Sequence, residues 1–477
     1  MVLLFLKVGE YIISSSASIM PGISIGPVVM LDGMVDASTS IQRRAVTIQT
    51  SPKLDWPDMA GPYPSLDEAP ASDIFGRNGS GPLSGLLVAD FGRVLAGPYC
   101  TMLLADMGAT VVKIESPDGD ETRAWKPPVR EGESTYYLSI NRNKGSIALD
   151  LRGEDDRRIA QDIARRADVM VENFKPNSLA RYGLDYESVA ETNPEVIYAS
   201  ITGFGTAGGA SLPGYDLLVQ ALSGLMSLTG APDTPAYRSG VAVFDVITGL
   251  HAAIGILAAL RERARTGRGQ QIEVNLMSSA LSGMVNQTAG YLLSGTVPTR
   301  LGNEHPSIYP YEPLPTGAGD IVIAIGNDPQ FRKLCQALDA PHLSLDPRFA
   351  TAPARSLNRE DLRPELQAAL AARSSAEWFD VLSPAGIPCA PINDVRQGLD
   401  FAEHIGLDPV VTIGEGSEAI PTVRNPITFS ETPVSYDLVP PAHDGNRGQV
   451  LAWLETGREA TAAQRRPAYA TQRKVQQ

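Results

Sequence analysis

The strongest constraint in this sequence is a regular alternation of short apolar runs and helix-like stretches that begins at residue 86. Residues 86–91 are predicted as a buried strand, a Gly-Pro turn follows at Gly97, and residues 99–107 have a helical composition. A second apolar run covers residues 109–115. Strand, helix and strand at this spacing form a βαβ unit, whose right-handed crossover leaves the two strands parallel.

The same alternation continues as far as residue 202. Its predicted elements are a strand at 146–151, a helix at 154–167, a strand at 169–172, a short helix near 179–182 and a strand at 196–202. Elements in this order build an open parallel sheet with helices on both faces. The predicted fold class is therefore α/β.

Composition narrows the class of function. The chain has 477 residues, enough for two or three domains, and a formal net charge of -14. This charge argues against a broad nucleic-acid surface, whereas a phosphorylated small molecule needs only a local cluster of cations. The three cysteines lie far apart and give neither a disulfide framework nor a metal-ligand spacing. We expect a cytoplasmic protein with no metal site, no nucleic-acid partner and no membrane span.

Residues 1–80 differ from the rest of the chain. Residues 1–30 are mildly apolar, but charged residues and several serines interrupt them, so the apolar run is too short for a membrane span. Residues 51–85 are rich in proline, glycine, serine and aspartate, a composition typical of linkers. We predict a poorly ordered N-terminal extension, and we hypothesise that Met59 is the natural start of translation.

Asp245 lies between a strand-like segment at 240–244 and a long helical run at 246–265. Within the helical run, apolar residues recur at steps of three and four, the spacing of one buried face. An aspartate at this junction fits two interpretations. It is an N-cap that accepts hydrogen bonds from the first free amides, or it is a carboxylate nucleophile that those amides keep ionised in a cleft. The local sequence fits both.

Two other stretches carry candidate ligand-binding residues. Arg142 and Lys144 lie two apart among asparagine and glycine in a predicted loop, which forms either a phosphate site or a solvated turn. Asn173 and Phe174 follow the predicted strand at 169–172. Ligands of open α/β sheets bind at this C-terminal edge of the strands. These two residues are therefore placed to bracket an adenine ring.

The second half of the chain contains a further boundary. A loop dense in proline, glycine and tyrosine separates the region of Asp245 from a strand and three predicted helices. We predict a large domain at 81–295, a small α+β domain at 302–395 and a C-terminal segment at 400–477.

Taken together, the motifs resemble those of the family III CoA-transferases, the group of formyl-CoA and carnitine-CoA transferases. The resemblance runs from about Leu83 to the C-terminal region and leaves the N-terminal extension outside. The shared motifs include Asp90-Phe91, Ala96-Gly97-Pro98, Gly108-Ala109, Asp168-Val169, Glu172-Asn173-Phe174, Gly214-Tyr215-Asp216, Asp245, Thr266-Gly267-Arg268-Gly269-Gln270 and Gly302-Asn303-x-His305-Pro306. Their number and their order make the match specific.

The resemblance implies a fold and a set of site residues. The fold is a Rossmann-like large domain formed by both ends of the chain, with the small domain inserted and two subunits interlocked as a homodimer. Asp245 matches the catalytic aspartate, and Tyr215 and Asp216 are further catalytic candidates. The residues expected to contact CoA or its thioester are Val94, Leu95, Ala96, Asn173, Phe174 and Arg181.

The implied activity is transfer of CoA from an acyl-CoA to a small free carboxylate. The aspartate attacks the thioester to give a mixed anhydride and then an aspartyl-CoA thioester, so that one exchange is divided into smaller covalent steps. Coenzyme A is then a substrate, and the resemblance implies no permanently bound cofactor.

Two alternatives stay open. The family also contains α-methylacyl-CoA racemases, which carry histidine where this chain has Tyr215. Racemisation needs two groups with pKa values near the working pH, and tyrosine, with an ordinary pKa of roughly 10, fits this role poorly. The second alternative is a CoA-binding protein without activity, against which the retained Asp245 argues. Arg93 and Leu95 stand where several family members have histidine and glutamine, so the substrate stays open.

Overall fold

The computed structural model describes residues 2–8, 11–17, 74–77, 80–305 and 307–460. The chain divides into two compact units, Met1–Pro64 and Ser65–Gln477. In the first unit the described residues form an antiparallel hairpin of β1 (Val2–Val8) and β2 (Tyr11–Ala17). Most of the predicted N-terminal extension, including Met59, lies outside the described residues.

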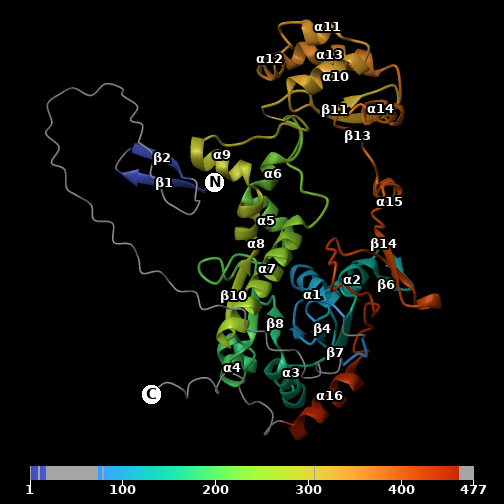
Figure 1. Ribbon diagram of the computed structural model, residues 1–477. Helices are drawn as coiled ribbons and strands as arrows, with labels where there is room; N and C mark the ends of the chain where they lie inside the picture. Colours follow the sequence, from blue (N-terminus) through green and yellow to red (C-terminus); the bar gives the residue numbers. More distant parts are fainter. Residues whose placement is uncertain (1, 9–10, 18–73, 78–79, 306, 461–477) are drawn as a thin grey trace, which may run out of the picture. The chain divides into compact units, whose positions relative to one another are not determined.

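The second unit contains a six-stranded parallel sheet with the strand order β10-β9-β8-β3-β4-β7 (Figure 1). Its strands are β3 (Leu87–Asp90), β4 (Thr110–Glu115), β7 (Lys144–Ala148), β8 (Val169–Glu172), β9 (Ile197–Thr202) and β10 (Gln270–Asn275). The chain winds outward from β3 to β7, then returns to β8 beside β3 and winds the other way. This sheet confirms the predicted α/β class, and its switch point lies between β3 and β8.

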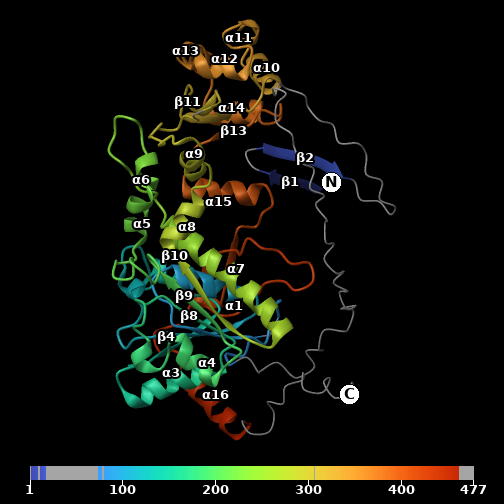
Figure 2. The same ribbon diagram turned by 90° about the vertical axis from the view of Figure 1, so that its left-hand side faces the viewer.

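Neighbouring side chains of the central strands pack on opposite faces of the sheet. On one face, Val88 of β3 belongs to a core that includes α1 (Ala96–Asp106) and α7 (Val243–Thr266). On the other face, Ala89 of β3 packs in a core with α3 (Glu154–Arg166). Figure 2 shows α3 and α7 with the sheet between them. Because helices cover both faces of the sheet, side chains on both sides of these strands are buried, and the strands are therefore continuous apolar runs.

α7 carries Asp245 in its first turn and ends at Gly267, whose left-handed backbone (φ 69°) forms the C-cap. It crosses α1 closely at Gly249, where an added Cβ would lie 2.7 Å from the Ala96 carbonyl oxygen. By length and mean hydropathy (2.0) α7 is the one candidate membrane span among the described residues, a property that core helices of soluble proteins share. The close crossing holds the first turn of α7 near the N-terminus of α1.

The C-terminal part of the chain returns to the edge of the same sheet. The side chain of Asn143 donates to the Ser435 carbonyl oxygen at 2.8 Å, and the Ser146 amide donates to Asn446 Oδ1 at 3.0 Å. Beyond these contacts, α16 (Arg447–Ala460) buries Val450 in the core that contains α3. Residues more than 280 positions apart in the chain therefore share one packed edge.

A third core lies in residues 309–387. Ile321, Ile323 and Leu334 are fully buried in it. An antiparallel sheet of β11 (Tyr311–Pro315), β12 (Asp320–Ala324) and β13 (Cys389–Pro391) packs with α10 (Asp328–Ala337), α11 (His342–Leu345), α12 (Ala352–Leu357), α13 (Arg359–Leu370) and α14 (Ser375–Leu382). The capping box of Ser374 and Glu377 fixes the start of α14.

The remaining described elements pack into or around these three cores. They are β5 (Val129–Arg130), β6 (Glu133–Ser134), α2 (Thr135–Ile140), α4 (Tyr186–Thr192), α5 (Asp216–Ser223), α6 (Leu225–Leu228), α8 (Leu276–Gly283), α9 (Asn286–Ser294), α15 (Val395–His404), β14 (Val410–Ile413), β15 (Ile420–Val423) and the short 3-10 turns Glu121–Ala124, Ala180–Tyr182 and Gly416–Glu418. Of these, α5 and α8 pack against α7.

Candidate active site

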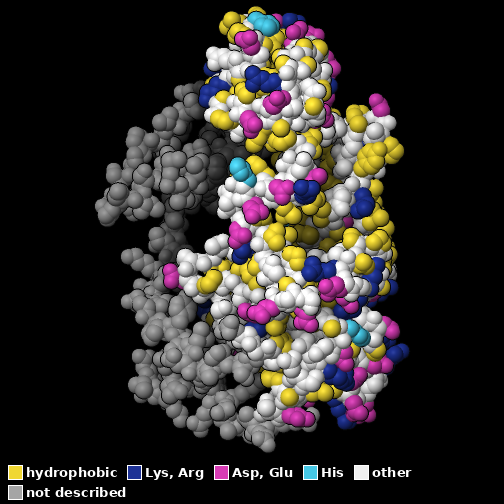
Figure 3. Space-filling view, turned by 90° about the vertical axis from the view of Figure 1, so that its right-hand side faces the viewer, with side chains coloured by type: hydrophobic (Ala, Val, Ile, Leu, Met, Phe, Trp, Pro, Cys, Tyr) yellow, Lys and Arg dark blue, Asp and Glu magenta, His cyan; other side chains and the backbone are white. Residues whose placement is uncertain are grey.

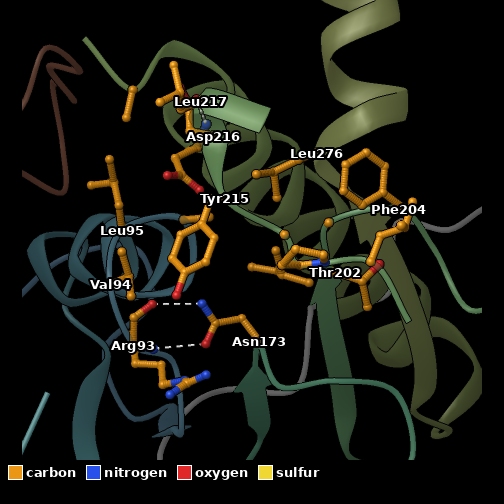
Figure 4. A pocket seen from close by; sticks show the side chains of 18 of the residues that line it. Arg93, Val94, Leu95, Asn173, Thr202, Phe204, Tyr215, Asp216, Leu217 and Leu276 are labelled. Atoms are coloured by element: carbon orange, nitrogen blue, oxygen red, sulfur yellow. Dashed lines mark hydrogen bonds between the residues drawn. The ribbon is translucent and has the colours of Figure 1, made fainter. Parts of the chain in front are cut away.

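A cleft of about 460 Å³ opens at the C-terminal edge of the parallel sheet, at the switch point between β3 and β8 (Figure 4). Its walls come from the segments after β3, β8 and β9 and from the first turns of α1, α5 and α7. The lining side chains include Arg93, Val94, Leu95, Ala96, Glu121, Trp125, Tyr136, Asn173, Phe174, Lys175, Tyr215, Asp216, Gln220, Arg238 and Asp245. Ligands of open α/β sheets bind at this position.

Asp216, the first residue of α5, caps α7. Its Oδ1 accepts hydrogen bonds from the backbone amides of Phe244 at 2.8 Å and Asp245 at 3.1 Å. The first amides of a helix have no partner within the helix, so a carboxylate from a neighbouring helix replaces a local N-cap. The N-cap interpretation of Asp245 is therefore wrong: Asp245 is the third residue of α7, and the N-cap position belongs to Ala242.

The Asp245 carboxylate lies in the cleft without a donor of its own. No hydrogen bond or ion pair joins its oxygens to any residue that the structure describes. Burial, and after it the negative charge of Asp216, raise the pKa of Asp245 to about 7. Removal from water destabilises the charged form of an acid. An unpaired carboxylate that titrates near neutral pH is suited to covalent or acid-base chemistry.

Gln220 connects the segment before α7 to the Asp216 carboxylate. Its Nε2 donates to Asp216, and its Oε1 accepts a hydrogen bond from the Ser239 amide at 2.8 Å. The Gln220 side chain is buried. The segment that leads into α7 is therefore fixed to the residue that caps α7.

The loop between β3 and α1 has a fixed and strained backbone. Asn173 accepts a hydrogen bond from the Arg93 amide at 2.9 Å and donates to the Arg93 carbonyl oxygen at 2.7 Å (Figure 4). The next residue, Val94, has a φ of 66°, a conformation that is costly for a β-branched residue. Strain of this kind persists only where the surroundings enforce it, commonly at a functional site. Through its two hydrogen bonds to the Arg93 backbone, Asn173 fixes the conformation of the loop that lines the cleft.

Three of the predicted ligand-binding residues lie outside the cleft. Arg142 is buried and holds Asp106 through two hydrogen bonds of 3.0 and 2.6 Å. Lys144 is buried in β7 and contacts Asp90 at 3.0 Å. Because both cations are used inside the protein, the structure does not form the predicted phosphate site. Arg181 is exposed over the Tyr182 ring, also away from the cleft lining.

The structure adds two aromatic residues that the sequence did not single out. Trp125 and Tyr136 line the cleft and pack edge to face, with ring centroids 5.2 Å apart. Burial and the charge of Asp245, followed by that of Asp216, raise the pKa of Tyr136 to about 12. Tyr136 therefore stays a neutral hydrogen-bond donor within the electrostatic reach of Asp245. The proline-rich stretch around Trp125 carries no periodic signal that would have revealed them.

Histidine and metal-ligand clusters are absent from the described lining of the cleft. Within the described ranges, no cluster of three or more His, Cys, Asp or Glu side chains has metal-binding geometry. No histidine belongs to the described lining of the cleft. Tyr215, which is 62% exposed, lies beside the Arg93–Asn173 pair in Figure 4. Of the predicted site residues, the structure brings Val94, Leu95, Ala96, Asn173, Phe174, Tyr215, Asp216 and Asp245 into one cleft.

Comparisons with known proteins agree on one family. The sequence model of CoA-transferase family III matches residues 83–447. A succinate–glutarate CoA-transferase of Agrobacterium fabrum is 42% identical over 391 residues, which are 79% of this chain and 96% of that protein. An acetyl-CoA:oxalate CoA-transferase of Acetobacter aceti is 40% identical over 337 residues, 70% of this chain and 86% of that protein.

A solved structure gives the same result. The crystal structure of a CaiB/BaiF family protein from Brucella suis superposes with a TM-score of 0.73 at 40% sequence identity. The match covers 79% of this chain and the whole of that chain. The two proteins are therefore similar in amino-acid sequence as well as in fold.

Proposed function

This chain belongs to CoA-transferase family III, and we propose that it moves CoA from an acyl-CoA thioester to a free carboxylate by way of Asp245. The observation that carries this proposal is the Asp245 carboxylate itself. It lies in a cleft at the switch point of the sheet, and Asp216 has taken over the capping of its helix. A carboxylate without another structural task is available as a nucleophile.

The proposed reaction balances without a redox partner. The Asp245 carboxylate attacks the thioester carbonyl, the C–S bond breaks, and CoA leaves as a thiolate. The thiolate attacks the Asp245 carbonyl of the mixed anhydride, which releases the first acid as its carboxylate and leaves an aspartyl-CoA thioester. The acceptor carboxylate then repeats these two steps in reverse order. The products are a new acyl-CoA and a free Asp245 carboxylate.

Each step passes through an oxyanion that needs hydrogen-bond donors in a dry cleft. Leu95 and Ala96 line the cleft at the N-terminus of α1, where the first amides have no partner within the helix. We assign these amides, with the neutral Tyr136 hydroxyl, as the donors. Removal of one such donor typically costs about 2.7–4 kcal/mol of transition-state stabilisation.

The proposed acceptor is a short dicarboxylic acid. Two similar relatives bear names that include glutarate, succinate and oxalate, and all three acids carry two carboxylates. The cleft supports this class because cationic side chains and Asp245 line the same cleft. We propose CoA as a substrate that enters along Asn173 and Phe174, with the acyl group toward Asp245.

The assembly is proposed to be an interlocked homodimer. In this proposal a large domain at 81–295 combines with the C-terminal segment at 400–477, and the small domain at 302–395 is inserted between them. The exposed apolar side chains of α7 and α9, such as Ile254 (63%) and Leu292 (77%), support a subunit interface. We propose a cytoplasmic location for the dimer.

Mass spectrometry of the acylated enzyme tests the nucleophile. Wild-type protein incubated with succinyl-CoA and digested after rapid denaturation should carry a covalent adduct on the Asp245 peptide. Asp245→Asn should lose the adduct and at least about 10³-fold of the transfer activity, since the covalent route is removed. Asp233→Asn, a change at an exposed turn outside the cleft lining, is the matched control and should retain both.

The stability of Asp245→Asn separates chemistry from folding. The pKa of Asp245 is raised in the folded protein, so ionisation costs stability as pH rises from the ordinary aspartate pKa, roughly 3.9, to about 7. The asparagine variant should therefore unfold at a higher temperature than wild type at pH 8. An adduct on a different residue, or an active Asp245→Asn enzyme, would exclude this proposal. Rapid deuterium exchange at the α-carbon of a 2-methylacyl-CoA would instead favour the racemase alternative.

A further inference from the structure

Three cationic side chains line the cleft, and their partners distinguish them. Arg93 forms an ion pair with Glu121 and lies over the Phe174 ring at 5.2 Å. Arg238 has no acidic partner in the described part of the chain, where its guanidinium makes one hydrogen bond of 3.3 Å to the Ser239 carbonyl oxygen. The third cation of the cleft lining is Lys175. Because the guanidinium of Arg238 has no acidic partner among the described residues, its positive charge is available to a ligand.

The backbone beside Arg238 is fixed relative to the nucleophile. The amide of Ser239 donates to Gln220 at 2.8 Å, and Gln220 donates to Asp216. Asp216 in turn holds the amide of Asp245 at 3.1 Å. A continuous chain of hydrogen bonds thus holds the backbone next to Arg238 in place relative to Asp245.

We propose that Arg238 binds the distal carboxylate of a dicarboxylate acceptor and thereby selects dicarboxylic over monocarboxylic acids. This inference rests on the proposed function. One carboxylate of the acceptor must attack the aspartyl-CoA thioester at Asp245, so the other carboxylate of a short acid needs a cation within the same cleft. Arginine suits this task because its guanidinium holds a carboxylate through two parallel N–H···O bonds.

Lys175 is the rival for this role, and its position argues against it. It follows Phe174 on the side of the cleft where the CoA is proposed to enter, and it also lines a smaller neighbouring cleft with Glu172. Arg238 instead lies on the segment that leads into α7. The acceptor site is therefore assigned to the α7 side of the cleft.

A competition assay measures the selectivity directly. The full-length protein is given succinyl-CoA with equal concentrations of glutarate and pentanoate, which are similar in length and differ in the distal carboxylate. The ratio of glutaryl-CoA to pentanoyl-CoA, read by mass spectrometry, equals the ratio of the two kcat/KM values and does not depend on the donor half-reaction. Arg238→Met should lower this ratio roughly 10- to 100-fold, which is the loss in affinity expected when a hydrogen-bonded pair of opposite charges is removed.

The variants separate a binding role from a structural one. Arg238→Lys keeps the charge but not the paired donors, so its ratio should be intermediate. Arg261→Met removes an exposed arginine of α7 outside the cleft lining and should leave the ratio unchanged. An unchanged ratio in Arg238→Met, or an equal loss for both acids, would overturn the inference. So would a fall in the ratio that follows Lys175→Met and not Arg238→Met.

Calorimetric titration with glutarate distinguishes failure of this inference from failure of the proposed function. If the wild-type enzyme forms neither product, the proposed transfer is wrong, and the binding of glutarate alone then decides the role of Arg238. Binding to wild type that weakens at least about tenfold in Arg238→Met would support the site. Equal binding by the two proteins, or no binding by wild type, would reject it.

Discussion

At the residue scale, the site depends on two carboxylates with different tasks. Asp216 accepts hydrogen bonds from the backbone amides in the first turn of α7. The Asp245 carboxylate is left without a hydrogen-bond partner among the described residues, and its pKa is about 7. Below pH 7 most Asp245 side chains are protonated and cannot attack a thioester. The rate of enzyme acylation at low acyl-CoA concentration should therefore rise with pH through about 7 and level off above it, in a stopped-flow or quenched-flow measurement.

Asp216→Asn tests the cause of this pH dependence. The amide oxygen of asparagine can still accept the α7 amides, but the neighbouring negative charge is removed, so the pKa of Asp245 should fall. The acidic limb of the profile should then move to lower pH by roughly 0.5–1 unit. The Asp233→Asn variant should keep the wild-type profile. A limb that does not move in Asp216→Asn would show that burial alone sets the pKa of Asp245.

At the scale of elements, the site depends on the distance between α1 and α7. Gly249 lets α7 approach α1, since an added Cβ would lie 2.7 Å from the Ala96 carbonyl oxygen and 3.2 Å from the Tyr99 ring. Gly249→Ala should therefore push the helices apart and shift the loop before α1. We expect a loss of about 1–3 kcal/mol in the free energy of unfolding, measured in urea, together with slower transfer.

Gly290→Ala in α9 is the matched control for this change. It also adds one methyl group to a helix, but nothing lies within 4 Å of the new Cβ. Its stability should stay the same or rise by up to about 1 kcal/mol, because alanine favours the helix. If Gly249→Ala were as stable and as active as wild type, the two helices would not be in close contact.

At the scale of the whole molecule, large hydrophobic side chains remain exposed on several elements. Figure 3 shows them gathered on the face that carries α15 and the β14–β15 hairpin. The exposed residues of α15 and its flanks include Val395, Phe401, Ile405 and Leu407, and those of α7 and α9 include Leu250, Ile254, Leu257, Leu292 and Leu293. Soluble monomers rarely leave surfaces of this kind uncovered. The proposed dimer would cover them.

Ile254→Glu tests the dimer on α7. A charge at this apolar position, which is 63% exposed, should cost binding energy only if a second subunit covers it. Because interlocked subunits must assemble as they fold, we expect refolded Ile254→Glu protein to have the mass of a monomer by light scattering at low micromolar concentration, whereas refolded wild type has the mass of a dimer. Leu345→Glu in α11, 78% exposed, should leave the dimer intact. A monomeric wild type would contradict the proposal.

Much of the fold follows from local sequence patterns. The strand predicted at 169–172 coincides with β8 (Val169–Glu172), and the helix predicted at 154–167 with α3 (Glu154–Arg166). Apolar periodicity and turn residues act over a few positions, so they are legible in the chain itself. The location of Asp245 at the entrance of a long helix was determined in the same way.

Tertiary structure alone decided which of the predicted site residues line the cleft and which are buried within the fold. The sequence left Asp245 as either cap or nucleophile, and the structure removed the first interpretation, because Asp216, 29 residues earlier in the chain, accepts the amides at the start of α7. Arg142 and Lys144 looked like loop cations, yet β7 begins at Lys144 and both charges pair with aspartates of distant segments. Burial and hydrogen-bond partners arise from contacts between remote residues, and no local pattern encodes them.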